Sequence, residues 1–188
     1  WVDTGIRLTL SKITSLQYGS PTRLLTSENI TPAKNSLPEQ ASVSVTYVGD
    51  LVASKWVSLV DSTLNSHNPC VEPTIAAEGP TPTLLGSTRA TGATSVVVLS
   101  PTNPDGFRLD TSKIFRLCYA ETDGTTTDTT WRDSYIRLHV SKVKSISAHS
   151  VTHITAGQVA RTTTLVGYPG HQGLQLNYMG SLANNMWM

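Results

Sequence analysis

Charged side chains are scarce in this 188-residue chain: they make up 14% of its residues, and the formal net charge is +1. Proteins that hold nucleic acid or anionic lipid present a concentrated positive charge. The sequence has no such footprint, which argues against nucleic acid as a partner. It also lacks an apolar run of about 20 residues, the length that a helix needs to span a bilayer. We therefore expect no membrane span.

Catalytic motifs are also missing. The chain contains no Gly-x-Ser-x-Gly elbow, no phosphate-binding glycine loop, no His-Glu-x-x-His and no Cys-x-x-Cys pair. Its five histidines are scattered along the chain rather than set at a metal-ligand spacing. The sequence therefore predicts a protein that is not an enzyme and that needs no cofactor and no metal.

Cysteine is rare, with Cys70 and Cys118 the only two. An even number at this separation suits a disulfide, although two buried thiols would give the same count. The sequon Asn29-Ile30-Thr31 makes Asn29 a candidate N-glycosylation site. Together these features predict an extracellular or cell-surface protein.

What the chain does contain is an internal repeat. Trp1–Lys12 lies over Trp131–Lys142 without a gap, and Trp, Asp, Ile, Arg, Leu, Ser and Lys recur in order. At an offset one residue longer, Tyr47–Leu51 matches Tyr178–Leu182 and the pair Trp56-Val57 matches Trp187-Met188. The period of about 130 residues suits a whole domain rather than a solenoid repeat.

This period divides the chain into parts of three copies. We expect residues 1–12 to be the C-terminal strand of a preceding repeat and 13–40 to be a Ser/Thr/Pro-rich linker. Residues 41–143 are predicted to form a complete domain, 144–173 a second linker, and 174–188 the N-terminal strands of a following repeat. The incomplete ends would pair with neighbouring copies in one polypeptide or with subunits that exchange strands.

Alternating side chains predict strands in the complete copy. Val43, Val45 and Tyr47 alternate with polar residues, and so do Ile136, Leu138 and Val140. Further strands are expected at 55–60, 95–99 and 114–121, whereas 65–93 has no clear period. Ser and Thr form about a quarter of the chain, which is typical of short strands joined by polar turns. This pattern favours an all-β, two-sheet antiparallel sandwich, with a small closed barrel as the alternative.

Three strings in this copy resemble a known repeat: Cys118-Tyr119-Ala120-Glu121-Thr122-Asp123-Gly124, Thr130–Leu138, and Ser58–Asn65 with Asn68-Pro69-Cys70-Val71. They are similar to the tandem-repeat immunoglobulin-like extracellular fibril proteins of aquatic microbial eukaryotes, such as the glycosylated fibrils recovered from fresh water. The resemblance implies immunoglobulin-like sandwiches in tandem and a homopolymeric, glycosylated extracellular filament that carries covalent glycans. It transfers no functional residues.

The four tryptophans recur with the repeat and are candidates for contacts between copies: Trp1, Trp56, Trp131 and Trp187. Exposed tryptophans also stack on sugar rings, so a cell-surface adhesin or carbohydrate-binding module is the alternative function. Within the linkers, 23–26 and 162–166 are candidate strands that could add to the sheet edge of a neighbour.

Overall fold

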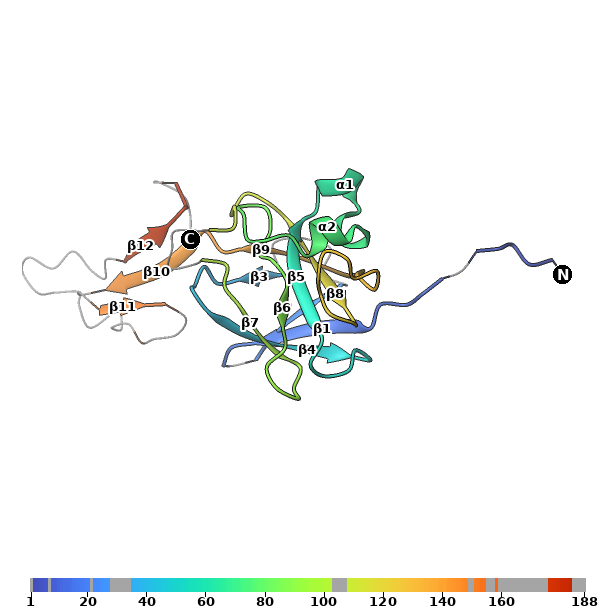
Figure 1. Ribbon diagram of the computed structural model, residues 1–188. Coiled ribbons are helices and arrows are strands. Elements are labelled where there is room, and N and C mark those ends of the chain that lie inside the picture. Colours follow the sequence, from blue (N-terminus) through green and yellow to red (C-terminus); the bar gives the residue numbers. More distant parts are fainter. Residues whose placement is uncertain are drawn as a thin grey trace, which may run out of the picture.

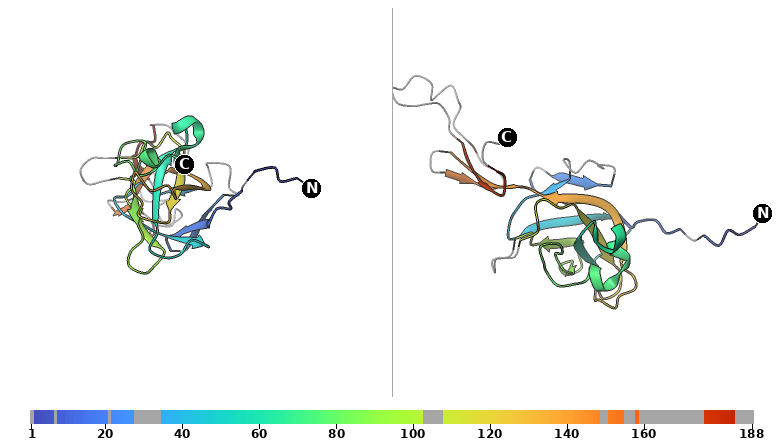
Figure 2. Two further views of the ribbon diagram at one scale, coloured as in Figure 1. Left: turned by 45° about the vertical axis from the view of Figure 1, so that its right-hand side comes forward. Right: turned by 90° about the horizontal axis from the view of Figure 1, so that it is seen from above.

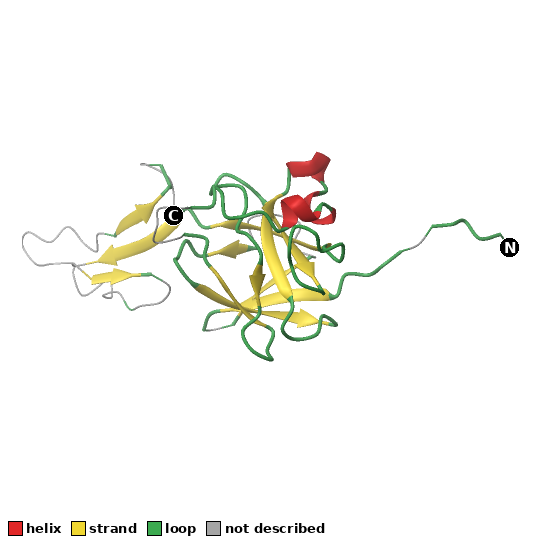
Figure 3. Cartoon of the chain, viewed as in Figure 1, coloured by secondary structure: helices red, strands yellow, loops and turns green. Residues whose placement is uncertain are grey.

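The regular secondary structure of the protein is mostly β-strand in the computed structural model, which describes residues 2–6, 8–20, 22–27, 35–102, 108–148, 151–154, 158 and 176–183 (Figures 1 and 3). The all-β prediction is confirmed. The strands are β1 (Ile13–Tyr18), β2 (Arg23–Thr26), β3 (Ser36–Leu37), β4 (Val43–Gly49), β5 (Trp56–Asp61), β6 (Thr88–Arg89), β7 (Val96–Leu99), β8 (Phe115–Ala120), β9 (Arg132–Val140), β10 (Val143–Ala148), β11 (Val151–His153) and β12 (Asn177–Gly180).

Two sheets form the body of the molecule. One has the strand order β2-β1-β4-β7 and the other β3-β9-β8-β5-β6. Neighbouring strands are antiparallel except β3, which pairs with β9 in the parallel direction. All five strands predicted from the alternating or β-branched runs are present, with ends that differ by at most a few residues.

The two sheets share one hydrophobic core, which makes the body a sandwich. Alternation places Val43, Val45 and Tyr47 of β4 inward, and Ile136 and Leu138 of β9 face them from the other sheet with no exposed surface. Because successive side chains point to opposite faces, the polar residues between them are left at the outer surface.

Strand β8 is buried on both of its faces. Phe115, Leu117 and Tyr119 face the main core, whereas Cys118 and Ala120 face a second cluster on the outer side of the same sheet. Both faces of β8 are apolar because β8 lies between β9 and β5 in the sheet and is covered above and below.

Short helical turns cover that outer face (Figure 1). They are α1 (Leu64–His67), η1 (Pro69–Val71) and α2 (Pro73–Ala76). These turns occupy the first part of the stretch 65–93, whose period could not be assigned. A disulfide between Cys70 of η1 and Cys118 of β8 anchors them, which confirms the predicted pairing. Closing a loop of this length stabilises the fold by about 4 kcal/mol in the chain-entropy model.

Part of the predicted linker 13–40 belongs to the sandwich. Strands β1 and β2 pair with each other, β1 pairs with β4, and Leu16 and Leu25 are buried in the main core. The expectation that 23–26 adds to a neighbour's sheet edge is therefore wrong, since β2 completes its own sheet. The second predicted linker also begins with strands, β10 and β11, while 162–166 lies outside the described residues.

Two further parts extend from opposite sides of the sandwich (Figure 2). Strands β11, β10 and β12 form a separate three-stranded sheet, here called the terminal sheet. On the other side, residues 2–6 and 8–10 run away from the body in an extended form, and none of them belongs to a strand. Residues 2–10 are here called the N-terminal segment.

Candidate functional site: a repeated corner

The chain turns the same corner twice. Only Ser141 and Lys142 separate β9 from β10, and Ser11 and Lys12 stand in the same way between the N-terminal segment and β1. In the first corner, the Ser11 hydroxyl donates to the Ile13 carbonyl (3.1 Å) and accepts from the Ile13 amide (3.3 Å). In the second, Ser141 makes the same two bonds with Val143 at 3.0 and 3.1 Å.

The strand pair that follows each corner has the same register. Ile13 lies opposite Gly49 and Leu16 opposite Tyr47, with a register shift between residues 13 and 15. In the terminal sheet, Val143 lies opposite Gly180 and Ile146 opposite Tyr178, with the shift between residues 143 and 145. Each corner is thus followed by an antiparallel strand pair with the same register and a β-bulge at the same position.

A glycine lets the backbone approach closely at each corner. Gly49 and Gly180 have φ angles of 137° and 146°, and a Cβ on either would collide with the carbonyl of Lys12 or Lys142. Those carbonyls accept amide hydrogens from beyond the glycine, Leu51 N at 3.0 Å and Ser181 N at 2.8 Å. No other residue type could occupy these positions without moving the corner.

A tyrosine fastens the loop beyond each glycine. The Tyr47 hydroxyl donates to the Val52 carbonyl at 2.8 Å, and the Tyr178 hydroxyl donates to the Ala183 carbonyl at 2.8 Å. The matching Tyr-x-Gly residues of the sequence therefore have one structural role, which is to hold the corner and its loop together.

Residues at and beside β8 and β9, in the sheet that does not contain β1, hold the first corner in place. The Lys12 amide donates to the Tyr119 hydroxyl (3.1 Å), the Ser11 hydroxyl reaches the Ser134 carbonyl (3.3 Å), and Lys12 Nζ lies 2.6 Å from Glu121 Oε2. The hydrogen bond to Glu121 raises the pKa of Lys12. Both charged side chains are at least one third exposed, so solvent weakens this ion pair, and the backbone bonds do most of the positioning.

The N-terminal segment keeps the local geometry of the start of β9. The Gly5 amide donates to Asp3 Oδ1 (2.9 Å) as the Tyr135 amide does to Asp133 Oδ1 (2.7 Å). Gly5 and Tyr135 both have positive φ, 72° and 64°. The next amides, of Ile6 and Ile136, donate to the hydroxyls of Thr4 and Ser134. The two segments thus share a turn as well as a sequence.

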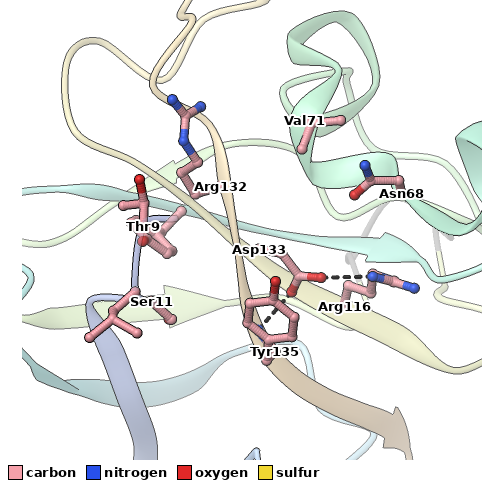
Figure 4. A pocket seen from close by; sticks show the side chains of 10 residues that line it. Thr9, Ser11, Asn68, Val71, Arg116, Arg132, Asp133 and Tyr135 are labelled. Carbon is pink, nitrogen blue, oxygen red and sulfur yellow. Dashed lines mark hydrogen bonds and ion pairs between the residues drawn. The ribbon is translucent and has the colours of Figure 1, made fainter. Parts of the chain in front are cut away.

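A small cavity of about 230 Å³ lies where the N-terminal segment meets the sandwich (Figure 4). Thr9, Leu10, Ser11, Asn68, Val71, Arg116, Tyr119, Arg132, Asp133 and Tyr135 line it. Asp133 pairs with Arg116 and Arg137, each at 2.7 Å. Burial raises the pKa of Asp133, but the bonds to Arg137 and Arg116 outweigh it and hold the pKa below its usual value. This network ties β8 to the start of β9 beneath the corner.

The tryptophans do not share one role. Trp131 has no exposed surface and packs with the disulfide in the outer core, so the prediction that it contacts another copy is wrong. Trp131 shares this cluster with Cys70 of η1 and Ala76 of α2, two helical turns that the sequence did not predict. Trp56 is half-buried against the same cluster, with Arg89 over its ring at 5.8 Å. Trp1 and Trp187, like the candidate glycosylation site Asn29, lie outside the described residues.

One buried carboxylate organises the loop that leads into Trp131. Asp128 is 4% exposed and accepts the amides of Asp123, Gly124 and Thr130 together with the Thr130 hydroxyl. Burial raises its pKa, but these four bonds more than offset that effect and lower the pKa to about 2. The site is structural: every bond holds the turn closed over the outer core.

Within the described part of the chain, no group of three or more His, Cys, Asp or Glu side chains could hold a metal ion. None of the helices described there is long and apolar enough to cross a membrane. No protein family model, no curated protein and no solved structure shows a significant match to this chain. The repeated corner is therefore the feature from which a function can be argued.

Proposed function

We propose that the protein is a structural, non-catalytic subunit of a glycosylated extracellular filament, built from immunoglobulin-like units in tandem. The repeated corner carries this proposal. Ser11–Ile13 and Ser141–Val143 make the same bonds and feed strand pairs of the same register, about 130 residues apart. Two such corners are what a chain of identical units would require.

The strand order supports an immunoglobulin-like unit. The order β5-β8-β9 matches the C-F-G sheet of that fold, and β1-β4-β7 matches strands A, B and E. A tryptophan on the C-position strand, Trp56, packs against the disulfide cluster. The disulfide departs from the usual B–F bridge, because it joins Cys118 on the F-position strand to a helical turn.

The short connection between units gives the filament its stiffness. Strand β9 belongs to the sandwich and β10 to the terminal sheet, and only Ser141 and Lys142 lie between them. Serine bonds and a glycine contact fix this junction, so consecutive units cannot swing as they would on a long Ser/Thr linker. A contact repeated head to tail in this way produces a rod when its rotation does not close a ring.

The disulfide is consistent with an oxidising extracellular environment. Covalent glycans at Asn29 and at surface hydroxyls would cover the rod, in line with the resemblance to fresh-water fibrils. The partner in this proposal is the protein itself.

Negative-stain electron microscopy of the native material, before and after enzymatic deglycosylation, tests the proposal. We expect fibres with a constant axial repeat and a smaller diameter after deglycosylation. Dispersed monomers at high protein concentration would overturn it. The adhesin alternative has lost an aromatic candidate, because Trp131 is buried; glycan-array binding by dispersed monomers would restore that alternative.

A further inference from the structure

The N-terminal segment exposes a row of apolar side chains. Ile6, Leu8 and Leu10 alternate along it with exposed fractions of 68%, 89% and 87%. An extended segment with period two has one apolar face, which is the pattern of a strand that covers a core.

The sandwich already shows how such a strand is used. In β9 the matching side chains, Ile136, Leu138 and Val140, are at most 1% exposed. Strand β9 packs across β1 and β2 of the opposite sheet, where Leu16 and Leu25 belong to the same core. The N-terminal segment has the sequence, the turn and the apolar face of β9, but it has no core beneath it.

At the opposite side of the molecule, the terminal sheet shows the complementary deficiency. Its strand order corresponds to β2-β1-β4, with His153 opposite Ile146 where Leu25 lies opposite Leu16. No second sheet lies on it among the described residues. Leu176 is 43% exposed, whereas its counterpart Val45 is 1% exposed. Tyr178 and Ile146 are half-buried, whereas Tyr47 and Leu16 are buried. This face is apolar in the positions where β1 and β4 are apolar.

We infer that residues 2–10 of one copy of this chain lie across β10 and β11 of a second copy, in the position that β9 occupies over β1 and β2. The inference rests on the proposed function and specifies how copies join. The strand and the open sheet are on opposite sides of the sandwich, so each copy has one of each to offer (Figure 2). The contact is heterologous, because the strand of one copy meets the sheet of the next, and such a contact adds copies head to tail.

Sedimentation velocity of the 188-residue chain, its oxidised disulfide intact, over a range of concentrations tests the contact. The wild-type chain should give a series of sizes that lengthens with concentration and does not stop at a dimer. A strand variant, Ile6→Asp with Leu8→Asp, should remain monomeric. A sheet variant, Ile146→Asp with Leu176→Asp, should do the same. Val52→Asp, which charges an exposed aliphatic position elsewhere (62% exposed), should assemble like the wild type.

Mixing the two monomeric variants is the decisive step. The sheet variant still carries an intact strand and the strand variant still carries an intact sheet, so the mixture should form a one-to-one dimer and nothing larger. The dimer also shows that the strand variant has kept a folded terminal sheet. A mixture that stays monomeric, or a strand variant that assembles like the wild type, overturns the inference.

The failure of this contact is distinguishable from the failure of the proposed function. A wild-type chain that is monomeric at every concentration, alongside regular fibres in the native material, would reject the strand contact alone. The open sheet would then be covered by another part of a longer polypeptide. The absence of native fibres would reject the filament itself.

Discussion

The sheet β2-β1-β4 inside the sandwich and the terminal sheet β11-β10-β12 are two versions of one structure in different surroundings. Their strands pair in the same register after the same corner, yet Val45 is 1% exposed and Leu176 is 43% exposed. The comparison teaches that the corner fixes the local pairing, whereas burial comes from a second sheet. The same local pairing is found with a second sheet and, among the described residues, without one.

The largest expected effect comes from making the same substitution at two matching positions, Leu138 in β9 and Leu8 in the N-terminal segment. Leu138→Ala should lower the free energy of unfolding by about 2 to 5 kcal/mol, because it opens a cavity in a fully buried site. Leu8→Ala, at the matching exposed position, should change it by about 0.5 kcal/mol or less in the monomer. Urea titrations followed by tryptophan fluorescence measure both. Equal losses would show that residues 2–10 already pack on a core of their own chain.

The corner glycine should matter almost as much. Gly49→Ala forces a Cβ onto the Lys12 carbonyl at a φ of 137°, with an expected cost of about 1 to 3 kcal/mol. Gly79→Ala is the matched control, because nothing lies within 4 Å of its Cβ position and its φ is not positive. Thermal unfolding should place Gly49→Ala well below wild type and leave Gly79→Ala near it. Similar melting temperatures for the two variants would show that the corner does not require glycine at position 49.

Acid should weaken the sandwich through Asp128. The pKa of Asp128 is about 2 in the folded protein and 3.8 in the unfolded reference, so its stabilisation is complete above pH 3.8. That stabilisation is lost as the pH falls from 3.8 toward 2. Asp128→Asn should therefore flatten the fall of the urea midpoint over this range, whereas Asp50→Asn, at an exposed aspartate, should follow the wild type. A fall of unchanged steepness in Asp128→Asn would contradict the assignment.

The smallest effect is expected at the ion pair of the first corner. Lys12→Met removes a solvent-exposed pair with Glu121 and should shift the urea midpoint only slightly, and less in high salt. Tyr119→Phe removes the buried hydroxyl that accepts the Lys12 amide and should cost about 1 kcal/mol. A larger loss in Lys12→Met than in Tyr119→Phe would mean that charge, and not the backbone bond, holds the corner.

Much of this architecture could be predicted from the sequence because its signals are local. Strands β4 and β9 follow from apolar residues at every second position, and the presence of two cysteines favoured the disulfide that the structure shows. The matching positions of the two corners follow from the offset of about 130 residues, since the same residues make the same short-range bonds.

Strand β1 was mistaken for linker, and β2 was expected to add to a neighbour's sheet, because both strands are short and rich in polar residues. Only Ile13, Leu16 and Leu25 supply buried apolar side chains, and they are spread among Ser, Thr and Gln. The buried state of Trp131 was also missed, because the turns that cover it come from a stretch without a clear period. In both cases long-range packing decides what a weak local pattern leaves open.

The sequence by itself determined the β class and the match of residues 1–12 with 131–142, because alternating side chains and serine bonds to the second residue along depend on near neighbours. Only the tertiary structure decided which apolar faces are covered. Leu8 and Leu138 are the same residue in the same motif, and they differ because Leu138 lies on a second sheet and Leu8 does not. Whether an apolar side chain of a strand is buried depends on the sheet that packs against that strand, and the strand's own sequence does not specify this.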